Sequence, residues 1–296
     1  MFNDIERVGF AGLGAMGAGI AQRLLDAGFT VVGWNRTKAK AQDLLDEGMG
    51  WADTPRELAA SADVVFTMLT NTAAVTAIAD GPEGILAGLR PGTVWADIST
   101  IAPEASVALA ERVAATGARF LDCPVSGSPA TLAAGQMSVM VGGEREAFDH
   151  VAPVLHAIGP KVTYIGPNGH AILTKVAINL ALVASVTAFA EGVALVEKAG
   201  VDRAAVVDAV LKSVIASPVI GYRAPLLVDD TDVFADVELQ QKDLVLAQDL
   251  ARGLGMAVPT CAATSEMLNA ARASERADRD FVVSVHEAYR RIGGME

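Results

Sequence analysis

A glycine-rich segment near the start of the chain has the spacing of a dinucleotide-binding loop. Residues 12–17 read Gly-Leu-Gly-Ala-Met-Gly, directly after the apolar run Val8–Ala11 and before a helical pattern. In a GxGxxG loop the first glycine permits a tight turn, the second lets the backbone approach a pyrophosphate, and the third lets helix pack on strand. The helix that follows offers free N–H groups and its positive dipole end to the phosphates. The predicted cofactor residues here are Gly12, Leu13, Gly14, Ala15, Met16 and Gly17.

The end of the next expected strand indicates which dinucleotide is bound. Sites for NAD usually place an acidic residue roughly 20 positions after the glycines, where it accepts a hydrogen bond from the ribose 2′-hydroxyl. This chain has Asn35-Arg36-Thr37 instead. The Arg36 guanidinium suits a 2′-phosphate, and Asn35 and Thr37 can add hydrogen bonds. We expect NADP(H) to be preferred and NAD(H) to be a weaker option; the alternative interpretation of Arg36 is a solvated side chain at a helix start.

Lys175 and Asn179 have the spacing of a catalytic pair. They lie four residues apart in a strongly apolar segment, so on a helix they project from one face. Apolar surroundings lower the pKa of an ammonium group, which suits general acid/base catalysis near neutral pH. The alternatives are a lysine that extends its charge to solvent and a hydrogen-bonded core amide.

Small polar residues follow other expected strands, where α/β sheets bind ligands. Ser126-Gly127-Ser128 combines hydroxyl groups with accessible N–H groups, which is a natural cradle for a carboxylate. Thr100 and the Met68-Leu69-Thr70 turn end strands at the same edge of the sheet.

These residues need a scaffold, and the first half of the chain predicts one. Short β-branched runs alternate with helical patterns, which is typical of βαβ units and a parallel sheet. The expected strands are Val8–Ala11, Thr30–Trp34, Val64–Met68, Thr93–Asp97, Phe120–Asp122, Ser138–Val141 and Val162–Ile165. Helices are expected at Met16–Ala27, Lys38–Asp46 and Pro103–Thr116.

The pattern changes near residue 166. Beyond it we expect only helices, at His170–Lys198, Arg203–Val214, Leu239–Arg252, Pro259–Ala273 and Phe281–Arg291. The prediction is an α/β chain with a doubly wound Rossmann-type domain at residues 1–166 and an all-helical substrate and dimerisation domain at 167–296. The segment His170–Lys198 is apolar almost all round, so we expect it to be the spine of the second domain and part of a homodimer or homotetramer interface.

Composition excludes several classes of protein. The 296 residues are 52% hydrophobic with a formal charge of −12, so disorder and binding to nucleic acid or anionic lipid are disfavoured. Two cysteines without CxxC spacing predict neither a disulfide framework nor a zinc site. No signal peptide is predicted, and the uncharged run from Val176 to Ala190 is short for a membrane span. We therefore expect a cytoplasmic protein without nucleic-acid, membrane or metal partners.

Taken together, the sequence resembles the β-hydroxyacid dehydrogenase family, the relatives of 3-hydroxyisobutyrate dehydrogenase and of the glyoxylate and succinic semialdehyde reductases. The resemblance extends from Val8 to about Arg291. It rests on five blocks in order, which are 12–17, 97–100, 122–127 leading to 140–143, 166–179 and 242–244.

The resemblance implies reversible hydride transfer between a nicotinamide and a small hydroxy acid or its carbonyl form. It assigns Lys175 as the general acid/base, Asn179 to holding the substrate, and the 126–128 segment to the substrate carboxylate. It places Thr100 beside both ligands and Met68, Leu69 and Thr70 along the cofactor. It also implies cofactor contacts for Val75 and Lys242.

Four departures from the family pattern leave the substrate open. Ser128 stands where a second glycine is common, Thr131-Leu132 where a Gly-Ala pair is common, and Ile178 where a second asparagine is common. Thr70 replaces a frequent proline in the cofactor turn. Two alternatives therefore stay open: an imine reductase on the same fold, and a dinucleotide-binding module without catalysis.

Overall fold

The chain divides into two compact units, residues 1–175 and 176–296, which are described separately. The computed structural model describes residues 5–229, 231–274 and 276–295. The predicted domain boundary at 166 coincides with the end of the last strand, β9 (Lys161–Gly166). The division into units falls later, inside helix α9 (His170–Lys198), which begins in the first unit and continues into the second.

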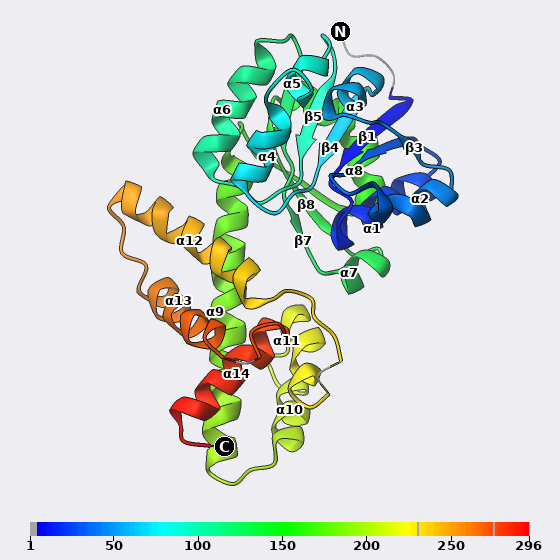
Figure 1. Ribbon diagram of the computed structural model, residues 1–296. Helices are drawn as coiled ribbons and strands as arrows, with labels where there is room; N and C mark the ends of the chain where they lie inside the picture. The colour runs from blue at the N-terminus through cyan, green and yellow to red at the C-terminus, as the bar shows by residue number, and fades with distance from the viewer. Residues whose placement is uncertain (1–4, 230, 275, 296) are drawn as a thin grey trace. The chain divides into compact units, whose positions relative to one another are not determined.

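The first unit is built on one nine-stranded sheet (Figure 1). Its strand order is β3-β2-β1-β4-β5-β6-β8-β7, with β9 paired to β8. The strands are β1 Arg7–Ala11, β2 Thr30–Trp34, β3 Gly50–Trp51, β4 Val64–Thr67, β5 Val94–Asp97, β6 Arg119–Asp122, β7 Val125–Ser126, β8 Ser138–Gly143 and β9. The seven expected strands are confirmed; the two-residue strands β3 and β7 are too short to show a pattern. The sheet is parallel except that β8 runs antiparallel to β6 and β7, which differs from the all-parallel expectation.

Strand side chains alternate between two separate cores, as expected for a sheet buried on both faces. On β4, Val64 and Phe66 enter one hydrophobic cluster, called here the first cluster, while Val65 enters the second cluster on the other face. On β5, Ala96 enters the first cluster and Trp95 enters the second. Every one of these side chains is fully buried.

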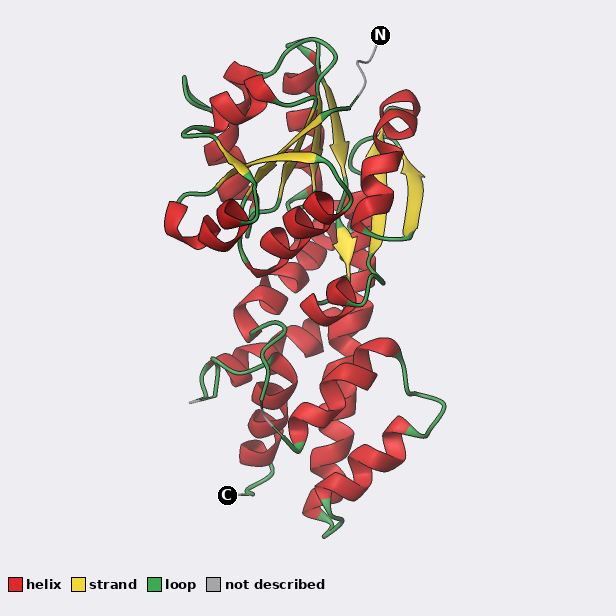
Figure 2. Ribbon diagram, turned by 90° about the vertical axis from the view of Figure 1, so that its right-hand side faces the viewer, coloured by secondary structure: helices red, strands yellow, loops and turns green. Residues whose placement is uncertain are grey.

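Helices cover both faces, so the predicted doubly wound architecture is confirmed (Figures 1 and 2). Buried residues of α1 (Ala15–Asp26), α2 (Gln42–Asp46), α7 (Pro129–Ala133) and α8 (Arg145–Ile158) belong to the first cluster. Those of α3 (Pro55–Ser61), α4 (Thr72–Ala79), α5 (Ile85–Gly88) and α6 (Pro103–Ala114) belong to the second. The short 3-10 helix η1 (Lys38–Ala41) precedes α2, so the expected helix at 38–46 is divided.

The second unit contains only helices among its described residues. After α9 come α10 Arg203–Leu211, α11 Pro218–Arg223, the 3-10 helix η2 Ala224–Leu227, α12 Val237–Leu254, α13 Pro259–Arg272 and α14 Phe281–Ile292. Their apolar faces pack into one core that includes Val186 and Val193 of α9, Leu244 of α12 and Phe281 of α14. The all-helical prediction after residue 169 is thus confirmed for the part of the chain that is described.

Helix α9 has an unusual composition for its length. Of the described helices it alone is long and apolar enough to cross a membrane, judged by length and composition. Core helices of water-soluble proteins meet the same criterion, and 44% of its most apolar window is buried. Its place in the core of the second unit fits the predicted role as a spine.

Candidate active site

The glycine loop between β1 and α1 has the backbone geometry that a dinucleotide requires. Gly12 has a φ of +99°, and a Cβ there would lie 2.2 Å from the Met68 carbonyl oxygen. A Cβ on Gly17 would lie 1.9 Å from the Gly12 carbonyl oxygen, so helix and turn meet too closely for any side chain. A Cβ on Gly14 would meet no described atom within 4 Å. Gly14 therefore borders open space at the start of α1, and the loop fits a pyrophosphate at that point.

A pocket of about 320 Å³ adjoins this loop within the first unit. Its walls bring together the glycine loop, the end of β2 and the turn after β4, as the sequence predicted. The lining residues are Gly12, Gly14, Trp34, Asn35, Arg36, Thr37, Lys40, Met68, Leu69, Thr70, Ala74, Ala77 and Ile78. They include two cations and, among the described residues, no carboxylate.

Lys40 was missed by the sequence analysis. It belongs to η1, three residues after Thr37, and lines the same pocket as Arg36. The tight 3-10 turn brings Lys40 back toward the strand end, whereas sequence distance alone does not say on which side a lysine projects. The two side chains make this end of the pocket suitable for an anionic group.

Asn35 has a structural role in addition to the one expected. Its Oδ1 accepts a hydrogen bond from the Leu13 N–H at 3.1 Å, and its Nδ2 donates to the Thr37 carbonyl oxygen at 3.0 Å. The amide therefore ties the glycine loop to the end of β2. Asn35 also lines the pocket, and its Nδ2 carries a second hydrogen, so its expected hydrogen bond to a 2′-phosphate stays a prediction.

Two further predicted cofactor residues point into the protein core. Val75 on α4 is fully buried in the second cluster, while its neighbour Ala74 lines the pocket. Leu13 is 2% exposed and belongs to the first cluster. Their side chains serve packing, because an apolar residue on the inner face of an element turns away from the ligand edge. Ala15 and Met16 begin α1 and do not line the pocket, and Met16 packs against the first cluster.

Asp122 positions the first turn of α9, the helix that carries Lys175. Asp122 Oδ1 accepts a hydrogen bond from the Gly169 N–H at 2.9 Å, and its Oδ2 accepts one from the Ile172 N–H at 3.1 Å. A carboxylate at a helix N-terminus satisfies free N–H groups and interacts favourably with the dipole. Lys175 follows one turn later and is 9% exposed. The sequence analysis did not find this cap, because Asp122 lies 47 residues from Gly169 along the chain.

In the second unit, Asn179 lies one turn beyond Lys175 on α9 and is 5% exposed. Its Nδ2 donates a hydrogen bond of 2.5 Å to Asp243 Oδ2 on α12. Lys242 Nζ lies 3.1 Å from Asp243 Oδ1. Asp243, which the sequence analysis did not single out, thus connects two predicted site residues.

In the segment predicted to bind the substrate carboxylate, Ser126 and Gly127 are accessible, whereas Ser128 takes part in a helix cap. Ser126 on β7 is half-buried and Gly127 is exposed. Ser128 is 4% exposed, and its side chain and backbone form a capping box with Thr131 at the start of α7. The Ser128 hydroxyl accepts the capping hydrogen bond from the Thr131 N–H and keeps its own proton, so its expected contact with the substrate carboxylate stays a prediction. Gly127 has no room for a side chain, since its Cβ would lie 2.3 Å from Met137 Sδ.

The remaining predicted site residue of the first unit is Thr100, which is half-buried just beyond the end of β5. Within residues 5–229, 231–274 and 276–295, no group of three or more His, Cys, Asp or Glu side chains could hold a metal ion.

Both units match models of known protein families. Residues 7–166 match the NAD binding domain of 6-phosphogluconate dehydrogenase. Residues 169–287 match the NAD-binding domain of NADP-dependent 3-hydroxyisobutyrate dehydrogenase. The two matches together cover the segments that carry the pocket, Lys175 and Asn179.

Curated relatives share most of the chain. Glyoxylate/succinic semialdehyde reductase 2 of Arabidopsis thaliana, a chloroplastic protein, is 32% identical over 93% of this chain and 77% of its own length. Cytokine-like nuclear factor N-PAC of Homo sapiens is 30% identical over 96% of this chain. The chain spans only about half of the N-PAC protein, 51% of its length.

Solved structures share the fold. 3-Hydroxyisobutyrate dehydrogenase from Salmonella typhimurium has a TM-score of 0.87 at 30% identity, covering 95% of this chain and 99% of that one. Psf3 in complex with NADP+ and 2-OPP has a TM-score of 0.87 at 28% identity, with the same coverage. An imine reductase from Streptomyces aurantiacus has a TM-score of 0.63 at 23% identity, covering 95% and 98%, and is similar in fold alone.

Proposed function

Because the chain belongs to the 3-hydroxyisobutyrate dehydrogenase family, we propose that it is an NADP(H)-dependent oxidoreductase of small hydroxy acids and their semialdehyde or keto acid forms. The observation that carries the proposal is the pocket in which Arg36 and Lys40 face the same space as Gly12 and Gly14. A dinucleotide needs glycine backbone at its pyrophosphate, and a 2′-phosphate needs cations at the end of the second strand.

Three side chains would hold the 2′-phosphate. Arg36 can bind it through two parallel N–H groups, Lys40 adds a second positive charge, and the Thr37 hydroxyl adds a donor. All three line the pocket and are exposed. The Psf3 structure contains NADP+, which supports the choice of this cofactor. NAD(H) lacks the phosphate, so we propose it as the weaker ligand.

Lys175 is proposed as the general acid/base. When bound, the nicotinamide supplies or accepts the hydride. In the reducing direction Lys175 Nζ gives a proton to the oxygen that becomes the hydroxyl, and in the oxidising direction it takes that proton back. The Asp122 cap fixes the helix turn that precedes Lys175.

The substrate is proposed to be a small carboxylic acid. Ser126 and Gly127 lie at a strand end and offer a hydroxyl and an N–H group to a carboxylate. Asn179 would hold the substrate hydroxyl or carbonyl, with its amide oriented by Asp243. The named reductase and dehydrogenase relatives support an acid of this size. The bulky pair Thr131-Leu132 at α7 is the feature that could select among such acids.

The test follows the absorbance of the reduced nicotinamide. Purified protein is supplied with NADPH or NADH and with glyoxylate, succinic semialdehyde, methylmalonate semialdehyde and tartronate semialdehyde. We expect turnover with NADPH that is lost in Lys175→Ala. Turnover with NADH alone would overturn the cofactor assignment and keep the family chemistry. NADPH binding without turnover of any acid would overturn the substrate assignment. Cyclic imines would then test the imine reductase alternative. If the protein does not reduce these imines either, a dinucleotide-binding module without catalysis is favoured.

We also propose that the chain works as a homodimer or homotetramer in the cytoplasm. Helix α9 supports this assembly, because more than half of its most apolar window is not buried within the chain. Light scattering at micromolar concentration tests the assembly, and a monomer mass would overturn it.

A further inference from the structure

A fully buried carboxyl group at the end of β5 is not used by the chemistry proposed above. Asp97 Oδ1 accepts hydrogen bonds from the Thr67 hydroxyl at 2.6 Å, the Ser99 hydroxyl at 2.6 Å and the Ser99 N–H at 3.2 Å. No donor among the described residues reaches Asp97 Oδ2. Buried polar atoms rarely lack a partner, so the asymmetry between the two oxygens calls for a functional explanation.

The Ser99 and Thr67 hydroxyl groups connect Asp97 to further hydrogen-bond donors. A hydroxyl has one proton, so a hydroxyl that donates to Asp97 can only accept from other groups. Ser99 Oγ accepts from the Leu69 N–H at 2.9 Å, and Thr67 Oγ1 accepts from the Trp95 indole N–H at 2.9 Å. Leu69 lines the pocket next to Gly12.

We propose that Asp97 is a positioning residue for the dinucleotide pocket, which holds the turn after β4 in place through Ser99. The turn Met68–Thr70 forms one wall, and its Met68 carbonyl oxygen occupies the space that a Cβ on Gly12 would need, so the turn packs directly against the glycine loop. Asp97 fixes the direction in which the Ser99 hydroxyl accepts, and Ser99 fixes Leu69. The assignment of the pocket to a dinucleotide rests on the proposed function, whereas the connection from Leu69 to Asp97 does not.

The protonation of Asp97 fits this role. Burial raises the pKa of the Asp97 carboxyl to about 6, against the opposing effect of the Ser99 and Thr67 hydrogen bonds, and the nearby Asp122 raises it further. Asp122 and the buried Cys123 thiol are the titratable groups of the adjacent strand that face it. Below about pH 6 a proton on Oδ2 removes the charge from the atom without a donor and leaves Oδ1 as the acceptor. Asparagine reproduces this neutral arrangement, with an amide in place of the protonated oxygen.

The test uses four variants and two measurements. The variants are Ser99→Ala, Asp97→Ala, Asp97→Asn and the control Ser106→Ala. Ser106 is a buried serine on α6 whose hydroxyl has no partner among the described residues, so its loss removes a hydroxyl without breaking a connection. Hydrogen exchange of the Leu69 amide is measured on the ligand-free protein, and NADPH affinity is measured by fluorescence titration.

In Ser99→Ala we expect the Leu69 amide to exchange about tenfold faster and NADPH to bind about tenfold more weakly, the effect of one lost hydrogen bond. Asp97→Ala should show both losses, Asp97→Asn should rescue most of them, and Ser106→Ala should show neither. Unchanged Leu69 exchange in Ser99→Ala would overturn the proposal. Equal losses in Asp97→Asn and Asp97→Ala would overturn it too, because asparagine keeps an oxygen that can accept the Ser99 hydrogen bonds and alanine does not.

A pH profile separates positioning from simple packing. Asp97 binds its proton more tightly in the folded chain than in the unfolded one, so its contribution to the thermal midpoint should fall as pH rises from about 4 to about 6. Asp97→Asn should lose this part of the slope, and an identical slope in both proteins would contradict the neutral carboxyl. If the wild type binds neither NADPH nor NADH, the proposed function fails, while the exchange and pH measurements still decide the role of Asp97.

Discussion

Asn179 Nδ2 donates a hydrogen bond of 2.5 Å to Asp243 Oδ2, and both side chains are buried. A carboxylate only accepts hydrogen bonds, so it determines which end of the Asn179 amide turns toward it. The amide oxygen is thereby left to accept a hydrogen bond from another group. Lys242 Nζ, 3.1 Å from the other carboxylate oxygen, offsets part of the charge of Asp243. Asp243 thus positions the side chain that we propose holds the substrate.

Removal of that carboxylate should weaken substrate binding. In Asp243→Ala the Asn179 amide can rotate, so we expect the KM for the acid to rise about 10- to 100-fold, which matches a hydrogen bond to a charged group of about 1.5–3 kcal/mol. Asn179→Ala should have a similar effect. Because the two residues act as a unit, the double variant should lose little more than either single one. Steady-state kinetics with the acid varied measures this.

The matched control for Asp243 lies on the same helix. Asp249 is an exposed aspartate on α12 that pairs with Arg252. We expect Asp249→Ala to leave the KM unchanged. Additive losses in the Asp243/Asn179 double variant would contradict the positioning role.

Cofactor choice should depend on two cations and not on a third nearby. Arg36→Ala and Lys40→Ala should each weaken NADPH binding about 10-fold or more, the effect of losing a charge-assisted hydrogen bond, and should leave NADH binding nearly unchanged. Lys38 is the control: it belongs to η1 but lies over the Trp51 ring, 5.0 Å from its centroid, and does not line the pocket. Fluorescence titration measures the affinity of each variant for both cofactors. An equal loss of affinity for NADPH and NADH would contradict a 2′-phosphate contact.

Residues whose role depends on the local backbone could be predicted from the sequence, whereas residues that act through distant contacts could not. The roles of Gly12, Gly14 and Gly17 follow from local backbone chemistry, so a motif of six residues was enough. Asp243 acts through a contact with a residue 64 positions away, which no local pattern encodes. For Val75 the family resemblance predicts a cofactor contact, and the structure adds that the 3.6-residue helix period turns its side chain into the core.

The bounds of the strands could likewise be predicted from local sequence, but the direction of a strand could not. The strands β1, β4 and β5 are strongly apolar and were predicted nearly to the residue. The antiparallel strand β8 has the same composition as a parallel one, because direction is set by the connections and not by the strand residues. The capping box that Ser128 forms with Thr131 was not predicted, because Thr131 was considered only as a departure from the family.

A buried ion pair should dominate the stability of the second unit. Arg223 Nη1 lies 2.5 Å from Asp280 Oδ2, and the carboxylate also accepts from the backbone N–H groups of Phe234, Ala235 and Val282. Asp280→Ala removes all of these acceptors and leaves a buried guanidinium uncompensated, so we expect a loss of about 3–5 kcal/mol in the free energy of unfolding. Chemical denaturation measures it.

Two comparisons make that expectation specific. Arg223→Met keeps the three backbone hydrogen bonds to Asp280, so it should cost less than Asp280→Ala. The exposed pair Arg252 and Asp249 should contribute no more than about 1 kcal/mol. Similar losses from the buried and the exposed pair would contradict the argument.

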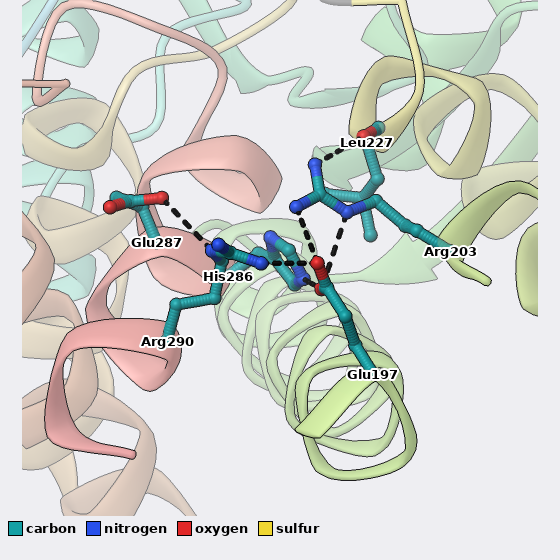
Figure 3. A network of polar contacts seen from close by, with 6 residues as sticks. All are labelled: Glu197, Arg203, Leu227, His286, Glu287 and Arg290. Atoms are coloured by element: carbon teal, nitrogen blue, oxygen red, sulfur yellow. Dashed lines mark hydrogen bonds and ion pairs between the residues drawn. The ribbon is translucent and has the colours of Figure 1, made fainter. Parts of the chain in front are cut away.

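His286 should make the second unit less stable in mild acid. Its Nε2 lies 3.0 Å from Glu197 Oε2, in a network where Glu197 also binds Arg203 and Arg290 (Figure 3). Burial lowers the pKa of His286, and the Arg203 charge adds to this, although Glu197 acts in the opposite direction. Burial alone would raise the pKa of Glu197, but hydrogen bonds and charge from Arg203 and Arg290 outweigh it and lower that pKa. Glu197 therefore stays ionised while His286 titrates.

The sign of the effect follows from proton binding. The unfolded chain binds a proton at His286 near the ordinary pKa of 6.5, and the folded chain binds it only at lower pH. Below that value the unfolded state holds more protons, so the contribution of His286 to stability is complete above it and is lost as the pH falls. His286→Gln keeps a hydrogen-bond donor and does not titrate, so its unfolding free energy should lack this loss between about pH 7.5 and pH 5. His156→Gln, on the exposed side of α8, serves as the control. If wild type and His286→Gln lose stability in parallel across this range, His286 is not buried as a neutral ring.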